Sequence, residues 1–119
     1  MRRRRADPAW PAPERAARLV LSRAAELDGN AYDTLGAAAE MLDAKHPLAA
    51  TLLRRAMIED TLDGGKSKRY RHAARHLSDC ASAAPQVGDF GGFPDHAAFA
   101  AQLKKRHGRK YGFWQLAGD

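Results

Sequence analysis

The sequence has very few cysteine and aromatic residues and no long apolar run. One cysteine, Cys80, stands among 119 residues, which excludes an internal disulfide and suits a reducing cytoplasm. Aromatic residues make up only 8% of the chain, so the composition argues against a sheet rich in strand formers. No apolar run approaches the roughly 20 residues that span a bilayer. The opening MRRRR is followed by ADPAWPAPER, which has no apolar core for a signal peptide. We therefore expect a cytoplasmic protein that makes no contact with membranes.

Charge is unevenly spread along the chain, although the formal total is +6. Counted from the sequence, residues 1–25 carry +5, residues 26–63 carry −5 and residues 64–119 carry +6. The acidic middle can neutralise the basic flanks if the segments pack side by side. The competing interpretation is a surface that binds polyanions.

Alanine-rich helical periodicity predicts an all-α fold of about five helices. The chain is organised around residues 46–62, where Pro47 suits the first helical turn and Gly64 follows the last one. Its apolar face consists of Leu48, Leu52, Leu53, Ala56 and Met57. The other expected helices cover residues 13–27, 31–44, 67–83 and 95–107.

Single residues refine this prediction. Asn30 is expected to cap the second helix, and Gly36 to allow a neighbouring helix to approach closely. Pro85 should end the fourth helix. The segment 109–119 contains three aromatic residues that we expect to fold back onto the helices.

The domain division follows from the same patterns. Residues 1–11 are expected to form a flexible basic arm, because their arginines repel one another and their prolines resist helix. Residues 12–119 are expected to form a single helical-repeat domain. A repeat is suggested because the pattern around Tyr32 and Leu35 returns 38 residues later around Tyr70 and Ala73. This period is close to the one of about 34 in tetratricopeptide helix hairpins, so an N-terminal helix followed by two such hairpins is expected.

Several sequence stretches resemble an uncharacterised bacterial family of unknown function. These are PAPERAARLVL, LDGNAYDTLG, HPLAATLLRRAM, YRHAARHL and HGRKYGFW, which together extend over roughly residues 11–115. The family is related to C-terminal regions of SWIM zinc-finger proteins. The resemblance implies tetratricopeptide-like helices and members that are usually longer than this chain. It supplies no catalytic residues, and the zinc ligands of SWIM fingers are absent from this sequence.

His72, His76 and Cys80 follow one another at intervals of four residues on the fourth expected helix. Such spacing can place two imidazoles on one metal ion. Helical geometry turns His72 away from the Tyr70 and Leu77 stripe, however, so the alternative is two surface or inter-helix histidines and a semi-buried thiol. We predict no bound metal or cofactor.

Three acids, Glu59, Asp60 and Asp63, lie at the end of the central helix, where the helix dipole disfavours them. We expect them to pair with bases of the fourth helix. General acid-base chemistry with Tyr70 or His76 is the competing interpretation. No nucleophile with an adjacent base and no phosphate-binding glycine loop is present in the sequence, so we expect a protein that is not an enzyme.

The sequence therefore predicts a helical-repeat module that binds a protein or peptide, or another part of a longer chain. The expected contact residues are Tyr32, Leu35, Tyr70, Arg71 and Arg75, where aromatic anchors and arginines would select an acidic partner.

The alternative is a nucleic-acid-associated module that uses the N-terminal arginines and a basic C-terminal patch. The patch consists of Lys104, Lys105, Arg106, Arg109 and Lys110. These bases are followed by Tyr111, Phe113 and Trp114, and bases interleaved with stacking aromatics are typical of single-strand binders. The other interpretation is that Phe113 and Trp114 are packing anchors.

Overall fold

The computed structural model describes residues 12–118, and within that range every regular element is a helix. The predicted all-α class is therefore confirmed, whereas the N-terminal arm lies outside the described residues. The described residues form six α-helices instead of about five: α1 (Pro13–Ser22), α2 (Tyr32–Leu42), α3 (Pro47–Asp63), α4 (Tyr70–Val87), α5 (His96–His107) and α6 (Tyr111–Ala117). Two short 3-10 segments, η1 (Ala24–Glu26) and η2 (Ser67–Arg69), lie between them. None of the helices in this range is long and apolar enough to cross a bilayer.

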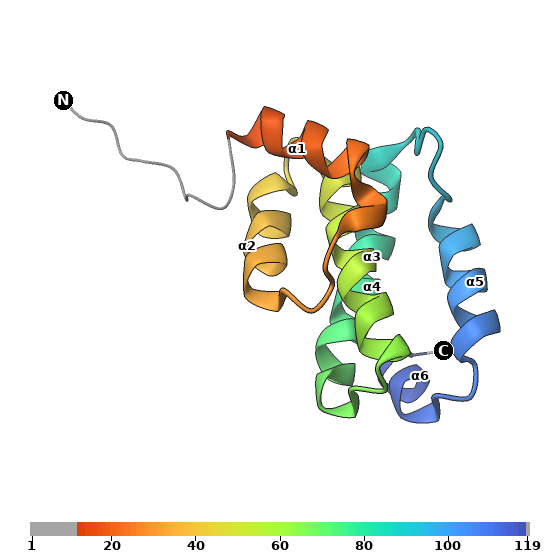
Figure 1. Cartoon of the computed structure of the whole chain (residues 1–119). Helices are drawn as coiled ribbons and strands as arrows, with labels where there is room; N and C mark the ends of the chain where they lie inside the picture. Colours follow the sequence, from red (N-terminus) through yellow and green to blue (C-terminus); the bar gives the residue numbers. More distant parts are fainter. Residues whose placement is uncertain (1–11, 119) are drawn as a thin grey trace.

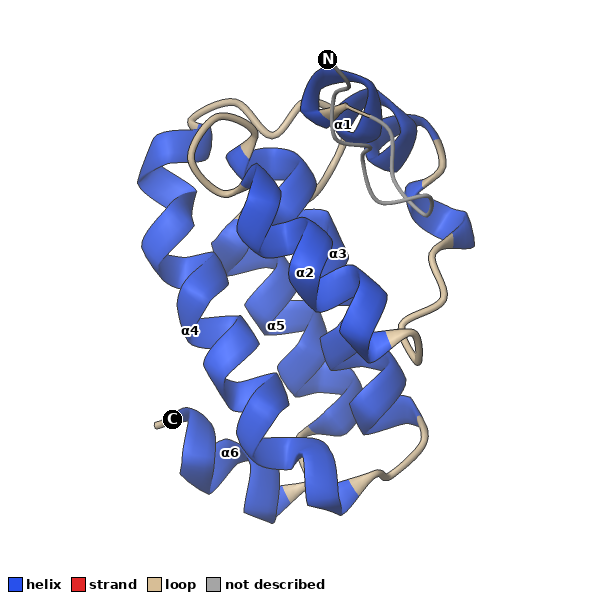
Figure 2. Ribbon diagram, turned by 90° about the vertical axis from the view of Figure 1, so that its left-hand side faces the viewer, coloured by secondary structure: helices blue, strands red, loops and turns tan. Residues whose placement is uncertain are grey.

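Helix α3 is the centre of the fold. It packs against α1, α2, α4 and α5, and α1 lies across one end of the other helices (Figures 1 and 2). The core has two parts that meet along α3. One joins α1 and α2 to the first half of α3, and the other joins the end of α3 to α4, α5 and α6. Burial on several sides explains why α3 has buried residues well beyond the predicted apolar face, including Arg54 and Arg55.

The C-terminal segment forms the additional helix, α6. Phe113 is fully buried and Trp114 is 7% exposed, and the Trp114 Nε1–H donates to the carbonyl oxygen of His107 at 2.8 Å. The prediction that the aromatic tail folds back is confirmed for these two residues. It is wrong for Tyr111, which is 72% exposed.

Two predicted helix ends are wrong. Helix α1 ends at Ser22, and the chain continues as η1. Helix α4 passes through Pro85 and ends at Val87, before Gly88 with φ +67°. Proline is tolerated there because Pro85 and Ala81 are both exposed, so water can satisfy the carbonyl that the missing N–H leaves unpaired.

The close approach expected at Gly36 occurs at Gly29 instead. A Cβ atom added to Gly36 would meet no atom within 4 Å, so that prediction is wrong. A Cβ on Gly29 would lie 2.1 Å from the carbonyl oxygen of Ala56. Gly29 is therefore the position where the connection between η1 and α2 presses against α3.

Candidate functional site: the Arg55 groove

The five predicted contact residues differ in how far they are exposed to solvent. Leu35 is 4% exposed and belongs to the core. Tyr32 is half-buried, and its hydroxyl lies 2.7 Å from the Thr61 hydroxyl. Tyr70 is also half-buried, with its ring packed edge-on against Phe113 at 6.0 Å between centroids. Only Arg71 and Arg75 are exposed, so these two are the members of the set that solvent reaches freely.

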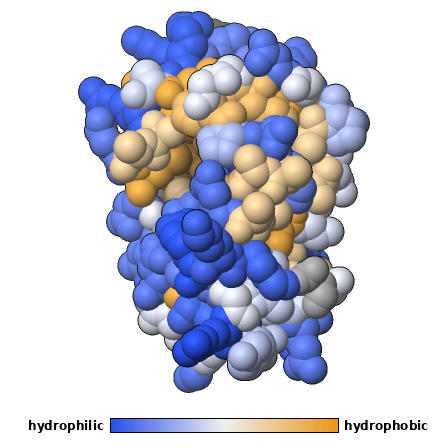
Figure 3. Space-filling model, turned by 90° about the vertical axis from the view of Figure 1, so that its right-hand side faces the viewer, coloured by the Kyte–Doolittle hydropathy of each residue, from blue (hydrophilic) through white to orange (hydrophobic). Residues whose placement is uncertain are grey.

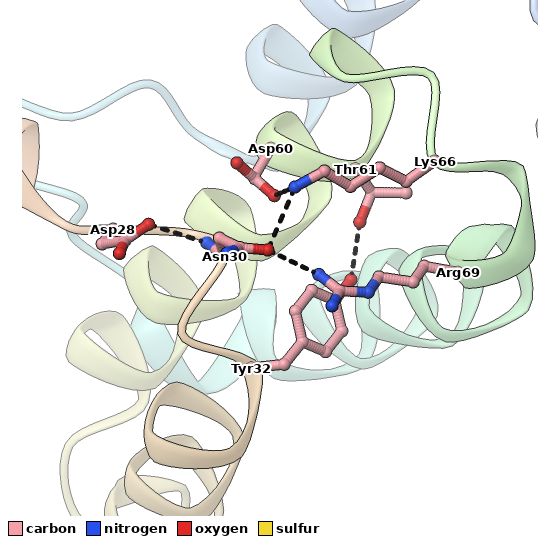
Figure 4. Close-up of polar contacts among 7 residues, drawn as sticks. All are labelled: Asp28, Asn30, Tyr32, Asp60, Thr61, Lys66 and Arg69. Atoms are coloured by element: carbon pink, nitrogen blue, oxygen red, sulfur yellow. Dashed lines mark hydrogen bonds and ion pairs between the residues drawn. The ribbon is translucent and has the colours of Figure 1, made fainter.

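Tyr32 belongs to a polar network that ties α2 to the end of α3 (Figure 4). Arg69 lies over the Tyr32 ring at 4.5 Å and donates to Asn30 Oδ1 at 3.0 Å. Lys66 Nζ donates to the same Asn30 oxygen at 3.0 Å and to Asp60 at 2.6 Å. Asn30 is therefore a hub for two basic side chains, and the prediction that it caps α2 is wrong, because Ala31 occupies that position.

The acids at the end of α3 are paired, though not with α4 as predicted. Asp60 binds Lys66, which lies in the connection that follows α3. Glu59 pairs with Arg106 at 3.2 Å, and Asp63 lies 3.0 Å from His107 Nε2. Both of these partners come from α5. The acids therefore hold α5 and the following connection in place, which offsets their unfavourable position at the negative end of the α3 dipole.

The basic C-terminal patch is partly used inside the protein. Arg106 is bound to Glu59, and the Lys104 amine lies 4.5 Å from the centroid of the Trp114 ring. Lys105 and Arg109 are exposed, and Lys110 is half-buried. Tyr111 is thus the one aromatic residue of the tail that is well placed to stack on a nucleotide.

His72, His76 and Cys80 do not converge. The described residues contain no group of three His, Cys, Asp or Glu side chains that could hold a metal ion. Cys80 is 1% exposed and faces the Thr51 carbonyl oxygen at 3.9 Å, and burial raises the pKa of its thiol to about 12. Burial and the nearby Arg54 charge lower the pKa of His76 to about 4. The thiol and the imidazole are therefore neutral at pH 7, and Cys80 packs as a small apolar residue.

Arg54 is a buried cation with its partners in place. It is 6% exposed and donates two hydrogen bonds to the Asp43 carboxylate, at 2.6 and 2.8 Å. A carboxylate oxygen of Asp79 lies 3.7 Å from its Nε. The hydrogen bond to Asp43 raises the pKa of Arg54. This bidentate pair connects the end of α2 to the middle of α3, and Asp79 adds α4.

Arg55, the next residue, is equally buried but has no such partner. It is 6% exposed, and neither its Nε nor its Nη2 has a hydrogen-bond acceptor among the described residues. Its guanidinium lies over the Phe99 ring at 4.5 Å and the Phe90 ring at 5.5 Å. Burial lowers the pKa of Arg55. An unpaired buried guanidinium is costly, and aromatic stacking returns only part of that cost.

Arg55 lies in a hollow between α3, α5, η1 and the connection that precedes α5, which we call the Arg55 groove. The hollow has a volume of about 300 Å³. Most of its walls are apolar, and Glu59 and Gln102 add polar atoms at the edge. The apolar lining residues are Ala24, Ala25, Leu52, Ala56, Phe93, Pro94 and Phe99. Figure 3 faces this side of the molecule and shows apolar side chains gathered over its upper half.

Over the part of the chain that the structure describes, the protein is small and all-helical, with an apolar hollow that contains one unpaired cation, Arg55. Residues 8–116 match the model of a family described as "Family of unknown function (DUF6880)". The chain belongs to this family. No curated protein and no solved structure matches it. The predicted resemblance to an uncharacterised family is thus confirmed, whereas the relationship to SWIM zinc-finger proteins stays a prediction.

The sequence carries one signal that points to Arg55. Two adjacent arginines interrupt the central helix α3, most of whose residues are buried, and successive residues of a helix point about 100° apart. At least one of them therefore has to enter a packed face. The partners Phe90 and Phe99 come from segments far along the chain, so the spacing of local residues does not reveal them.

Proposed function

We propose that this protein is a non-enzymatic binding module that takes a segment of a partner protein, or of a longer parent chain, into the Arg55 groove. One observation carries the proposal: Arg55 is only 6% exposed, and its Nε and Nη2 have no acceptor within the described residues. Apolar lining with a few polar groups is typical of binding sites. The hollow is small for an enclosed small-molecule site, whose volumes usually start near 300 Å³, and this favours a side chain of a larger partner.

This proposal keeps the predicted class of function and moves the contact surface. The set around Tyr32 and Tyr70 has lost most of its accessible aromatic area to internal packing, whereas the Arg55 groove combines an anchor cation with an open apolar hollow. The tetratricopeptide-like repeat belongs to the proposal too, because α2 with α3 and α3 with α4 are the most extensively packed helix pairs. We also propose the cytoplasm as the location, since Cys80 is a free thiol.

A selection from displayed random peptides tests the proposal. The library is panned on the wild-type protein and counter-selected on Arg55→Met. We expect peptides that bind the wild type and the Arg18→Met control, which loses an exposed arginine of α1, and that do not bind Arg55→Met. Peptides that bind the wild type and Arg55→Met but not Arg75→Met would indicate that the contact surface lies on α4. A library that yields no peptide whose binding depends on Arg55 would overturn the proposal.

The nucleic-acid alternative has a weaker basis, because Arg106 is paired and Trp114 is buried. Lys105, Arg109 and Tyr111 keep it testable. If it holds, RNA or DNA should shift in a gel at low ionic strength, and the shift should disappear with salt and with Lys105→Glu plus Arg109→Glu. An absent shift would remove this alternative.

A further inference from the structure

The unpaired atoms of Arg55 form one side of the guanidinium. Nε and Nη2 are the two donors that a carboxylate contacts when it approaches an arginine side-on, with two parallel N–H···O bonds. Both donors are buried and lack an acceptor among residues 12–118. The rings of Phe90 and Phe99 lie against the guanidinium. They restrict its orientation and leave the donor edge without a partner.

Two carboxylates of the protein lie nearby without filling this edge. Burial lowers the pKa of Arg55, and the charges of Asp95 and Glu59 oppose that effect without reversing it. Each is nevertheless bound elsewhere, since Asp95 accepts from the Ala98 N–H at 2.9 Å and Glu59 pairs with Arg106 at 3.2 Å. The protein thus keeps its own acids out of the position that a side-on carboxylate would take.

We propose that the Arg55 groove recognises an aspartate or glutamate side chain of a partner segment. The two carboxylate oxygens accept from the Nε–H and Nη2–H of Arg55, and an adjacent apolar side chain of the same segment enters the hollow. This inference rests on the proposed function and names the chemistry of the partner.

A singly charged side chain fits the groove better than other anions do. Arg55 is the one cation among the lining residues, and Glu59 at the edge would oppose a phosphate dianion. A terminal carboxylate is usually held by a set of backbone N–H groups. At the start of α5, which contributes Phe99 to the lining, the Asp95 side chain already accepts from the Ala98 N–H. The groove therefore supplies a side-chain fork rather than a backbone cradle.

The walls of the hollow indicate what accompanies the carboxylate. The lining includes three small residues, Ala24, Ala25 and Ala56, and two aromatic residues, Phe93 and Phe99. Such a space accommodates one aliphatic or aromatic side chain next to the acid. Burial of that apolar group removes water from the ion pair and strengthens it.

A titration followed by NMR tests the carboxylate with small probes. The probes are 3-phenylpropionate, its uncharged amide and inorganic phosphate, at constant ionic strength. The Arg55 Nε–H signal is assigned by its absence in Arg55→Lys. We expect 3-phenylpropionate to shift this signal with saturation, and the amide and phosphate to leave it in place. A signal that responds equally to acid and amide, or more to phosphate than to carboxylate, would overturn the inference.

The selected peptides separate this inference from the proposed function. Each Arg55-dependent peptide is remade with its acid replaced by the amide, Glu→Gln or Asp→Asn, and separately with an amidated C-terminus. We expect the side-chain change to weaken binding about tenfold or more, as for the loss of a charged hydrogen-bonded pair, and the C-terminal change to have no effect. Peptides that tolerate the side-chain change would contradict the carboxylate and leave the binding module standing. If the propionate titrates and no peptide binds, the carboxylate site stands and the protein-binding function fails.

Discussion

Arg54 and Arg55 are neighbours on the central helix, equally buried, and opposite in how the protein treats them. Arg54 has a bidentate carboxylate at 2.6 and 2.8 Å and a second acid at 3.7 Å. Arg55 has two aromatic rings and no acceptor within residues 12–118. The pKa of Arg54 is raised and that of Arg55 is lowered. The two residues are adjacent on one helix. The difference in their pKa shifts therefore comes from the side chains that other segments place around each guanidinium.

The two arginines differ in whether the protein itself compensates the cost of burying the charge. Removing a guanidinium from water costs several kcal/mol, which a partner of good geometry can offset. For Arg54 the carboxylates of Asp43 and Asp79 offset this cost, and these contacts join α2, α3 and α4. Arg55 leaves the cost uncompensated except for aromatic stacking, worth about 1–2 kcal/mol. We expect Arg55 to lower the stability of the fold, as residues retained for binding commonly do.

The largest expected effect is that of Arg54→Met. It leaves Asp43 without its bidentate partner, so the free energy of unfolding should fall by roughly 2–3 kcal/mol. The value lies at the low end for buried pairs because the Asp43 side chain is 43% exposed and can regain water. Urea denaturation measures the change.

Asp79→Asn serves as the graded control for this pair. Its contact with Arg54 is longer, at 3.7 Å, and Asp79 is 44% exposed, so its loss should cost well under half as much. If Arg54→Met costs less than about 1 kcal/mol, the pair is not the structural connection we describe.

Acid should act next most strongly, through His76, which lies on the Arg54 side of α3. Its pKa is about 4 in the folded protein because of burial, the Arg54 charge and other nearby cations, with Asp79 acting in the opposite direction. In the unfolded chain it takes up a proton near its ordinary pKa of about 6.5. The stabilising effect of neutral His76 is therefore complete above pH 6.5 and is lost as the pH falls toward 4.

The expected loss is roughly 1–2 kcal/mol, after allowance for partial exposure of the ring. Denaturation curves between pH 7 and 4 measure it, with His76→Gln as the variant and His96→Gln as a comparison. The pKa of His96 is also lowered, mainly by burial and then by Arg55, so its variant should remove part of the slope as well. An unchanged slope in His76→Gln would contradict this account.

Much of the helical framework was predictable from sequence, because its signals are local. Pro47 and Gly64 mark the ends of α3 as predicted, and Phe113 and Trp114 pack as anchors. Local patterns gave wrong predictions where a contact with a distant segment determines the role of a residue. Gly29 needs its small size because of the Ala56 carbonyl. Glu59 and Asp63 of α3 lie against bases of α5 that no helical spacing indicates. The fates of Arg54 and Arg55 are of this kind, since Asp43, Asp79, Phe90 and Phe99 are brought to them only by the tertiary fold.

Gln102→Glu should make Arg55 more like Arg54, because it gives Arg55 a possible carboxylate partner. Gln102 lines the Arg55 groove and is exposed, so a glutamate there offers Arg55 a carboxylate from within the protein. The free energy of unfolding should rise by about 0.5–1 kcal/mol, and binding of the selected peptides should weaken because the internal acid competes with theirs. Isothermal titration and urea denaturation measure the two effects.

Gln115→Glu makes the same charge change on α6, away from the groove, and should alter neither quantity. If both variants weaken the peptides to the same extent, general repulsion rather than competition at Arg55 is responsible. In that case the groove is not filled by the new side chain.

The smallest expected effect on stability is that of Arg55→Met, and it separates the two arginines most clearly. Replacing a buried side chain normally lowers the free energy of unfolding, as Arg54→Met should. At Arg55 the change removes an unpaired charge and keeps an unbranched apolar chain between Phe90 and Phe99, so stability should stay the same or rise by up to about 1 kcal/mol. Arg55→Lys keeps the charge but loses the two parallel N–H donors of the guanidinium, and its free energy of unfolding should not rise. If Arg55→Met instead loses as much stability as Arg54→Met, Arg55 supports the fold through its stacking on Phe99. The reason for assigning its unpaired donors to a partner would then disappear.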